Sequence, residues 1–88
     1  MIVNRKELRR LGNLYASQCV KMHNGDPHPK TLGEDKSAHA KAWDEASNQT
    51  IEKFTALAEK SGYTAEFNGL YPQIRDKKTG YWIQFLYD

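Results

Sequence analysis

The sequence predicts an α+β domain in which two antiparallel helices are followed by a C-terminal antiparallel β-hairpin or three-stranded meander. Two stretches within residues 1–60 repeat apolar residues at spacings of three and four, the period of one helix face. A cluster rich in Asn, Gly, Asp and Pro at residues 24–29 separates them. Residues 63–88 carry alternating apolar residues and two turn signals, which predict strands. A chain of 88 residues is expected to form a single domain.

The first helix is expected to begin at Asn4, which could form a capping box with Glu7. Its apolar stripe consists of Leu8, Leu11, Tyr15, Cys19 and Met22. Gly12 interrupts this helix at a cost of about 1 kcal/mol relative to alanine. We attribute this glycine to the close approach of another helix.

The second helix is expected to begin near Asp35 or Ser37, since either side chain can cap a helix N-terminus. Its inward stripe consists of Ala40, Trp43, Ala46, Ser47, Thr50, Ile51, Phe54, Leu57 and Ala58. Gly62 follows at the position of a C-terminal glycine cap, so the helix should end near Lys60.

The first turn signal in the C-terminal region is Asn68-Gly69, because both residues tolerate the positive φ of a type I′ turn. A hairpin at this turn pairs Phe67 with Leu70. Pro72 conflicts with this arrangement, since a proline in a central strand deletes a ladder hydrogen bond. Either the first strand pairs only near the turn, or a bulge lies at Pro72.

The second turn signal lies at residues 76–80, which fit a loop built on a type I turn with Gly80 in the left-handed conformation. This turn pairs Asp76 with Tyr81. Arg75 then lies opposite Trp82, where a cation–π pair can form.

Register assigns each side chain of the meander to one of two faces. The inner face collects Tyr63, Ala65, Phe67, Leu70, Ile74, Tyr81, Ile83, Phe85 and Tyr87. The outer face collects Thr64, Glu66, Tyr71, Gln73, Arg75, Trp82, Gln84 and Leu86. This outer face holds more apolar material than a solvated surface needs, and its mixture of residue types is favoured at interfaces. The alternative is that Trp82 and Leu86 simply pack against the interhelical loop around Leu32.

We therefore predict a partner-binding surface on the outer face of the sheet. It consists of Tyr71, Gln73, Arg75, Trp82, Gln84 and Leu86. Residues 81–87 also form an uncharged edge strand, which could pair with a second copy in a homodimer. The partner would be a protein or a nucleoprotein complex.

Charge distribution supports nucleic-acid binding as an alternative. Residues 1–30 hold six Lys or Arg against two acids, whereas residues 31–60 hold four against six. The basic side chains of the first helix that could neutralise phosphates are Arg5, Arg9, Arg10 and Lys21. The aromatic outer face of the sheet, with Tyr71, Trp82 and Arg75, could in addition stack single-stranded bases. The net charge of only +2 is low for a committed nucleic-acid binder.

Catalysis and metal binding are disfavoured, and no cofactor is expected. Cys19, His23, His28 and His39 could in principle bind zinc, but no paired metal-ligand spacing is present. A buried cysteine and exposed loop histidines are the expected description. The chain shows no known catalytic motif, and a small core leaves little room for a deep pocket.

The chain should also stay out of membranes and secretory pathways. No apolar segment matches a signal peptide or a membrane span, and a single cysteine excludes an internal disulfide. A cytoplasmic location is the expectation.

In its proportions and its aromatic C-terminal hairpin, the chain resembles small accessory proteins encoded in the early regions of bacteriophages and prophages. The residues that carry this likeness are the run Gly69 to Asp76 (GLYPQIRD) and the run Thr79 to Ile83 (TGYWI). The resemblance implies a non-enzymatic protein that binds and modulates or inhibits a host factor in the host cytoplasm.

Overall fold

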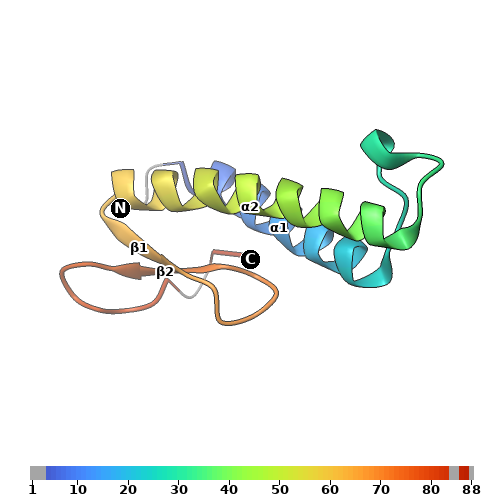
Figure 1. The fold of residues 1–88 in the computed structure, drawn as a ribbon. Helices are drawn as coiled ribbons and strands as arrows, with labels where there is room; N and C mark the ends of the chain where they lie inside the picture. Colours follow the sequence, from blue (N-terminus) through green and yellow to red (C-terminus); the bar gives the residue numbers. More distant parts are fainter. Residues whose placement is uncertain (1–3, 84–85, 88) are drawn as a thin grey trace.

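Two long helices and a short β-hairpin build the molecule. The computed structural model describes residues 4–83 and 86–87. In chain order the elements are α1 (Arg5–Asn24), η1 (Pro29–Thr31), α2 (Lys36–Lys60), β1 (Tyr63–Glu66) and β2 (Gln73–Asp76). The helices lie antiparallel, and the hairpin packs beneath the end where α1 begins and α2 ends (Figure 1). The predicted α+β class is confirmed, in an elongated molecule of 48 × 19 × 18 Å.

The helix ends match the sequence signals at three of four positions. Gly25 ends α1 with a φ of 69°, and Gly62 follows α2 with a φ of 87°, both in the left-handed region. Asp35 caps α2, because its Oδ1 accepts a hydrogen bond of 3.0 Å from the Ala38 amide. The capping box at the start of α1 is wrong. Asn4 has a left-handed backbone without a side-chain cap bond, and Glu7 pairs with Arg10 instead.

The interface between the helices contains a buried polar contact. Thr50 Oγ1 lies 2.7 Å from Gln18 Oε1, joining the middle of α2 to the middle of α1. The same hydroxyl lies 3.0 Å from the Ala46 carbonyl oxygen of its own helix. Both side chains are buried, so the contact satisfies polar groups that would otherwise be costly in the core.

The register of the β1–β2 pair differs from the predicted one. Tyr63 lies opposite Asp76 and Glu66 lies opposite Gln73, a shift of two residues from pairing around Asn68-Gly69. Gly69 does not have the positive φ that a type I′ turn requires, so the prediction of that turn is wrong. The physical reason is Pro72, which cannot donate to the ladder and precedes the first residue of β2.

The second turn forms as predicted. Gly80 has a φ of 75°, and the Asp76 amide donates to the Tyr81 carbonyl at 2.9 Å. Asp76 Oδ1 accepts hydrogen bonds from the amides of Thr79 and Lys78, which hold the pKa of this carboxyl below its usual value. The turn therefore has both the backbone and the side-chain bonds that fix it.

Beyond this turn, residues 81–83 follow β2 without forming a strand of their own. Arg75 makes an isolated bridge with Trp82, and the Ile83 amide donates to the Ile74 carbonyl at 3.1 Å. The predicted register of residues 81–83 is therefore confirmed. A third strand through Tyr87 is not formed in the part of the chain that the structure describes, and residues 84 and 85 lie outside that part.

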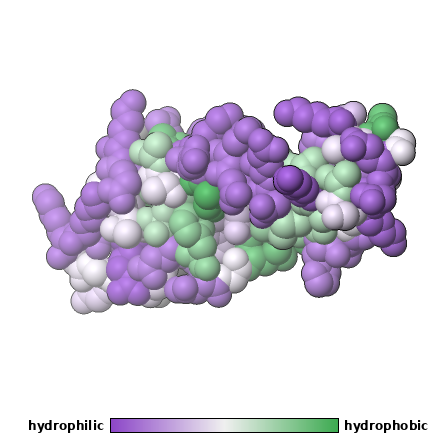
Figure 2. All heavy atoms as spheres, viewed as in Figure 1, coloured by the Kyte–Doolittle hydropathy of each residue, from purple (hydrophilic) through white to green (hydrophobic). Residues whose placement is uncertain are grey.

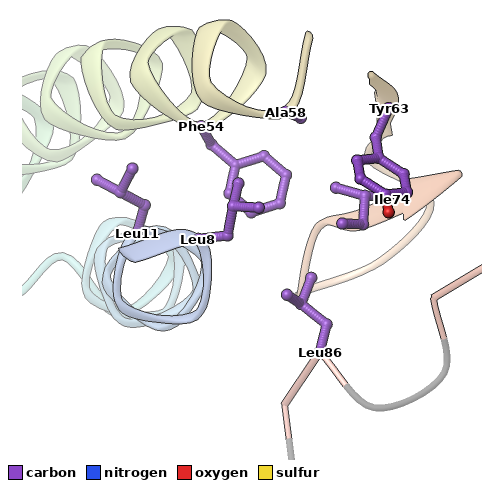
Figure 3. Packing of buried hydrophobic residues seen from close by; sticks show 7 residues of the cluster. All are labelled: Leu8, Leu11, Phe54, Ala58, Tyr63, Ile74 and Leu86. Atoms are coloured by element: carbon purple, nitrogen blue, oxygen red, sulfur yellow. The ribbon is translucent and has the colours of Figure 1, made fainter. Parts of the chain in front are cut away.

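Every element except η1 contributes to the core. Its buried apolar residues are Leu8 and Leu11 of α1, Phe54 and Ala58 of α2, Tyr63, Ile74 and Leu86. Their side chains converge on the space between the helices and the hairpin (Figure 3). The predicted inner-face residues Phe67, Leu70 and Tyr81 are instead 42%, 45% and 75% exposed. Phe67 and Leu70 lie in the β1–β2 loop that replaces the predicted tight turn.

Gly12 provides a close approach, but not for another helix. A Cβ atom at this position would lie 1.8 Å from the hydroxyl oxygen of Tyr87. The Tyr87 hydroxyl donates a 2.7 Å hydrogen bond to the Pro72 carbonyl oxygen. Gly12 therefore admits a C-terminal tyrosine that links α1 to the β1–β2 loop.

Candidate partner-binding surface

A hollow of about 570 Å³ opens beside the sheet, where the β1–β2 loop meets residues 82 and 83. It is lined by Asn68, Gly69, Tyr71, Gln73, Trp82 and Ile83. The β1–β2 loop supplies the first three, β2 supplies Gln73, and the segment paired with β2 supplies the last two. The volume falls within the range of ordinary ligand pockets, about 300–1,000 Å³.

Trp82 is held in place by an arginine. The Arg75 guanidinium carbon lies 4.2 Å from the centroid of the indole ring, as cross-strand pairing predicted. Arg75 Nε in turn lies 2.9 Å from Glu66 Oε1 of β1. Trp82 keeps 38% of its surface exposed. One part of the ring is thus stacked on a fixed cation while another part faces the hollow.

Tyr71 is held by a second aromatic residue. Its ring centroid lies 5.2 Å from that of Tyr87, whose hydroxyl is bonded to the carbonyl of Pro72. Burial, together with the nearby Tyr71 phenol, raises the pKa of Tyr87 to about 12. Tyr71, which forms one wall of the hollow, therefore contacts Tyr87, and Tyr87 packs against α1 at Gly12.

The hollow carries no formal charge on its described lining. Arg75, the cation stacked on Trp82, is paired with Glu66. Lys77 at the neighbouring turn is paired with Glu59 of α2. Aromatic faces and carboxamides therefore dominate the chemistry that this surface offers. Figure 2 shows one face of the molecule, on which apolar atoms gather near the middle and polar residues surround them.

The structure brings together four of the six residues predicted for partner binding. Tyr71, Gln73 and Trp82 line the hollow, and Arg75 supports it from beneath Trp82. Leu86 is only 1% exposed and belongs to the core, so its predicted place on the outer face is wrong. Leu86 itself lies in a turn, where alternation does not decide the direction of a side chain. Gln84 lies outside the described residues.

Three lining residues were missed from the sequence. Asn68 and Gly69 were assigned to a tight turn, and Ile83 was assigned to the inner face. The signal that could have revealed the loop is Pro72, because moving the start of β2 past the proline lengthens the connection. The alternative packing of Trp82 on the interhelical loop is not found. Leu32 is 71% exposed, and η1 lies at the opposite end of the helices from the hairpin (Figure 1).

The basic residues predicted for nucleic-acid binding do not form one patch. Arg10 Nε lies 3.1 Å from both carboxylate oxygens of Glu7, and Lys21 Nζ lies 4.8 Å from the centroid of the Trp43 ring. Lys21 lies eleven positions after Arg10 on α1, a rise of about 17 Å along the helix. Arg5 and Arg9 lie one turn apart on α1 and are half-buried.

The histidines of the interhelical region have structural partners. His28 Nδ1 accepts a 3.0 Å hydrogen bond from the Lys30 amide, and His39 Nδ1 lies 2.7 Å from Thr31 Oγ1. Both residues are buried, so the expectation of exposed loop histidines is wrong for His28, while His39 lies in α2. They are buried because they fix η1, one as its N-terminal cap and the other from α2.

Cys19 is half-buried beside Tyr15. Its contact with the phenol, together with burial, raises the pKa of Tyr15. Within residues 4–83 and 86–87, no three His, Cys, Asp or Glu side chains lie close enough together to hold a metal ion.

Comparisons with protein families, curated proteins and solved structures found no match to this chain. The likeness to phage accessory proteins therefore stays a prediction. None of the described helices is long and apolar enough to cross a membrane.

Proposed function

We propose that this protein is a non-enzymatic binding protein that engages a partner protein through the hollow beside its sheet and thereby modulates or inhibits that partner. The observation that carries the proposal is the hollow itself, in which Trp82 and Tyr71 expose aromatic surface around an uncharged floor. Tryptophan and tyrosine are enriched among the residues that dominate interface energies.

The support for both aromatic residues favours recognition over simple packing. Trp82 is stacked on Arg75, and Tyr71 lies against Tyr87. Side chains that are fixed before binding lose less conformational entropy when a partner arrives. A host protein as the partner, and an origin in a phage genome, rest on the resemblance of the sequence alone.

Affinity capture with matched variants tests the proposal. Wild-type protein, Trp82→Ala and Tyr81→Ala would be immobilised at equal amounts and exposed to lysate from the producing cells. Tyr81 is the matched control because it is an exposed aromatic neighbour outside the lining of the hollow. We expect a protein that is retained by wild type and Tyr81→Ala and lost with Trp82→Ala. Equal retention by all three would contradict the proposal, provided that circular dichroism shows all three folded.

Nucleic-acid binding is the second candidate, and the one-turn spacing of Arg5 and Arg9 on α1 favours it. Phosphate neutralisation predicts a steep loss of affinity as salt rises. A titration of labelled single-stranded and duplex DNA at two salt concentrations measures this dependence. Unchanged mobility of both nucleic acids at low salt would exclude this candidate.

A further inference from the structure

We propose that the hollow binds an uncharged, proline-containing segment of the partner in the polyproline II conformation. This inference rests on the proposed function and adds the chemical class of the bound segment. It is carried by three properties of the hollow: two supported aromatic walls, carboxamides between them, and the absence of free charge on the described lining.

The aromatic walls suit a pyrrolidine ring. Trp82 and Tyr71 both line the hollow, one from the segment paired with β2 and the other from the β1–β2 loop. Grooves lined by aromatic residues are the usual receptors for proline-rich segments, because such segments are extended before binding and lose little entropy. Arg75 and Tyr87 hold the two walls, so the receptor side is also ordered in advance.

The polar groups match a backbone without internal hydrogen bonds. A polyproline II segment leaves its carbonyl oxygens unbonded, and these oxygens need donors from the receptor. Gln73, Asn68 and Trp82 line the hollow, and their side chains carry such donors, two carboxamides and one indole N–H. Asn68 Nδ2 lies 3.5 Å from Glu66 Oε2, an interaction that engages only one of its two N–H groups.

Charge decides between a peptide and a nucleic acid as the occupant. Stacked bases would bring phosphates beside Trp82, and phosphates need cations. The cation at Trp82 is Arg75, and the Glu66 carboxylate already lies 2.9 Å from its Nε. A phosphate there would meet an arginine that already has a carboxylate partner, and that carboxylate would repel it. An uncharged peptide avoids this repulsion, so the charges favour the peptide.

The indole N–H signals of the two tryptophans provide the test. Trp43 is the internal reference, because its indole nitrogen donates to the Asp26 carbonyl at 3.0 Å in the half of α2 away from the hairpin. Full-length ¹⁵N-labelled protein would be titrated with a short blocked peptide of proline and leucine, with a glycine–serine peptide of equal length, and with oligothymidylate. We expect the proline peptide alone to shift the Trp82 signal saturably, while the Trp43 signal stays in place.

Two variants connect the shift to the hollow. Gln73→Ala should weaken peptide binding by roughly two- to tenfold, the loss of one neutral hydrogen bond. Tyr81→Ala should bind with unchanged affinity. Equal affinity of wild type and Gln73→Ala would place the peptide elsewhere and overturn the inference.

The remaining outcomes separate this inference from the proposed function. A saturable shift of Trp82 with oligothymidylate but not with the proline peptide would overturn the inference in favour of a nucleic acid. If no probe shifts Trp82 while protein capture still depends on Trp82, the proline class is wrong and the proposed function stands. If protein capture is also independent of Trp82, both the inference and the proposed function are wrong.

Discussion

Gly12 has no side chain, and the ring of Tyr87 from the other end of the sequence occupies the space that a side chain there would need. Gly12→Ala would place a Cβ atom 1.8 Å from the Tyr87 hydroxyl oxygen, so the ring must move. Overpacking of this kind costs about 1–3 kcal/mol, which exceeds the gain of about 1 kcal/mol from better helix propensity. We expect the free energy of unfolding to fall, as measured by urea denaturation.

The control for this prediction is the same substitution without the tyrosine. In a Tyr87→Ala background the clash is absent, so Gly12→Ala should raise the free energy of unfolding by up to about 1 kcal/mol. A loss of stability in both backgrounds would show that the ring of Tyr87 is not what the glycine accommodates.

Tyr87 also predicts a pH dependence in the alkaline range. Its pKa is raised to about 12, so the folded state favours the neutral phenol. Stability from this group is fully present below its ordinary pKa near 10 and is lost as the pH rises through about 12. Urea denaturation from pH 9 to 12 should therefore show a smaller loss of stability for Tyr87→Phe than for wild type. Parallel pH profiles would contradict the raised pKa.

At the scale of elements, the start of α2 offers a matched pair of substitutions. Asp35 and Ser37 were equal candidates for its N-terminal cap, and only Asp35 makes the cap bond. Asp35→Ala should cost about 1 kcal/mol, which lowers the melting temperature by roughly 4–8 °C in a domain of this size. Ser37→Ala, at an exposed position inside the helix, should change it little. A larger loss for Ser37→Ala in a calorimetric scan would contradict this assignment.

The elements differ in how far the sequence predicted them. The helix ends could be predicted from the sequence, because glycine, aspartate and proline determine the backbone conformation at their own position, as Gly25, Asp35 and Gly62 show. Strand register depends on partners far along the chain, and the local signal at Asn68-Gly69 was overridden by Pro72. The resulting shift of two residues is even, so Tyr63 and Ile74 keep their predicted inward direction.

The candidate site was predicted in part for the same reason. Alternation along β2 and its neighbour placed Gln73, Arg75 and Trp82 on one side, and the pairing of Arg75 with Trp82 is as expected. Leu86 could not be placed by alternation, because it lies in a turn. The hollow itself arises from the course of the β1–β2 loop, which only tertiary packing determines.

At the scale of the molecule, the core and the interhelical turn lie at opposite ends. The buried apolar cluster joins the hairpin to the start of α1 and the end of α2, whereas polar contacts of His28, His39 and Trp43 fix the other end. Regions with few buried apolar contacts open at lower free energy. Hydrogen exchange should therefore be faster at amides near η1 than at those around Phe54.

A core substitution tests this division. Phe54→Ala should lower the free energy of unfolding by about 3–5 kcal/mol and speed exchange throughout the molecule. Trp43→Ala should speed exchange mainly in the last turn of α1 and the first turns of α2. Uniform acceleration by Trp43→Ala would show that the two ends open as one unit.

The elongated shape also determines how the molecule rotates in solution. With extents of 48 × 19 × 18 Å and helices along the long axis, helical N–H bonds point nearly parallel to the axis about which tumbling is fastest. Their ¹⁵N relaxation therefore reports mainly the slow end-over-end rotation, and differs from that of N–H bonds oriented across the molecule. If two copies associated side by side along the segment at residues 81–83, the dimer would have a smaller ratio of length to width than the monomer. The spread of relaxation rates would then narrow, so relaxation alone separates a monomer from the predicted edge-paired homodimer.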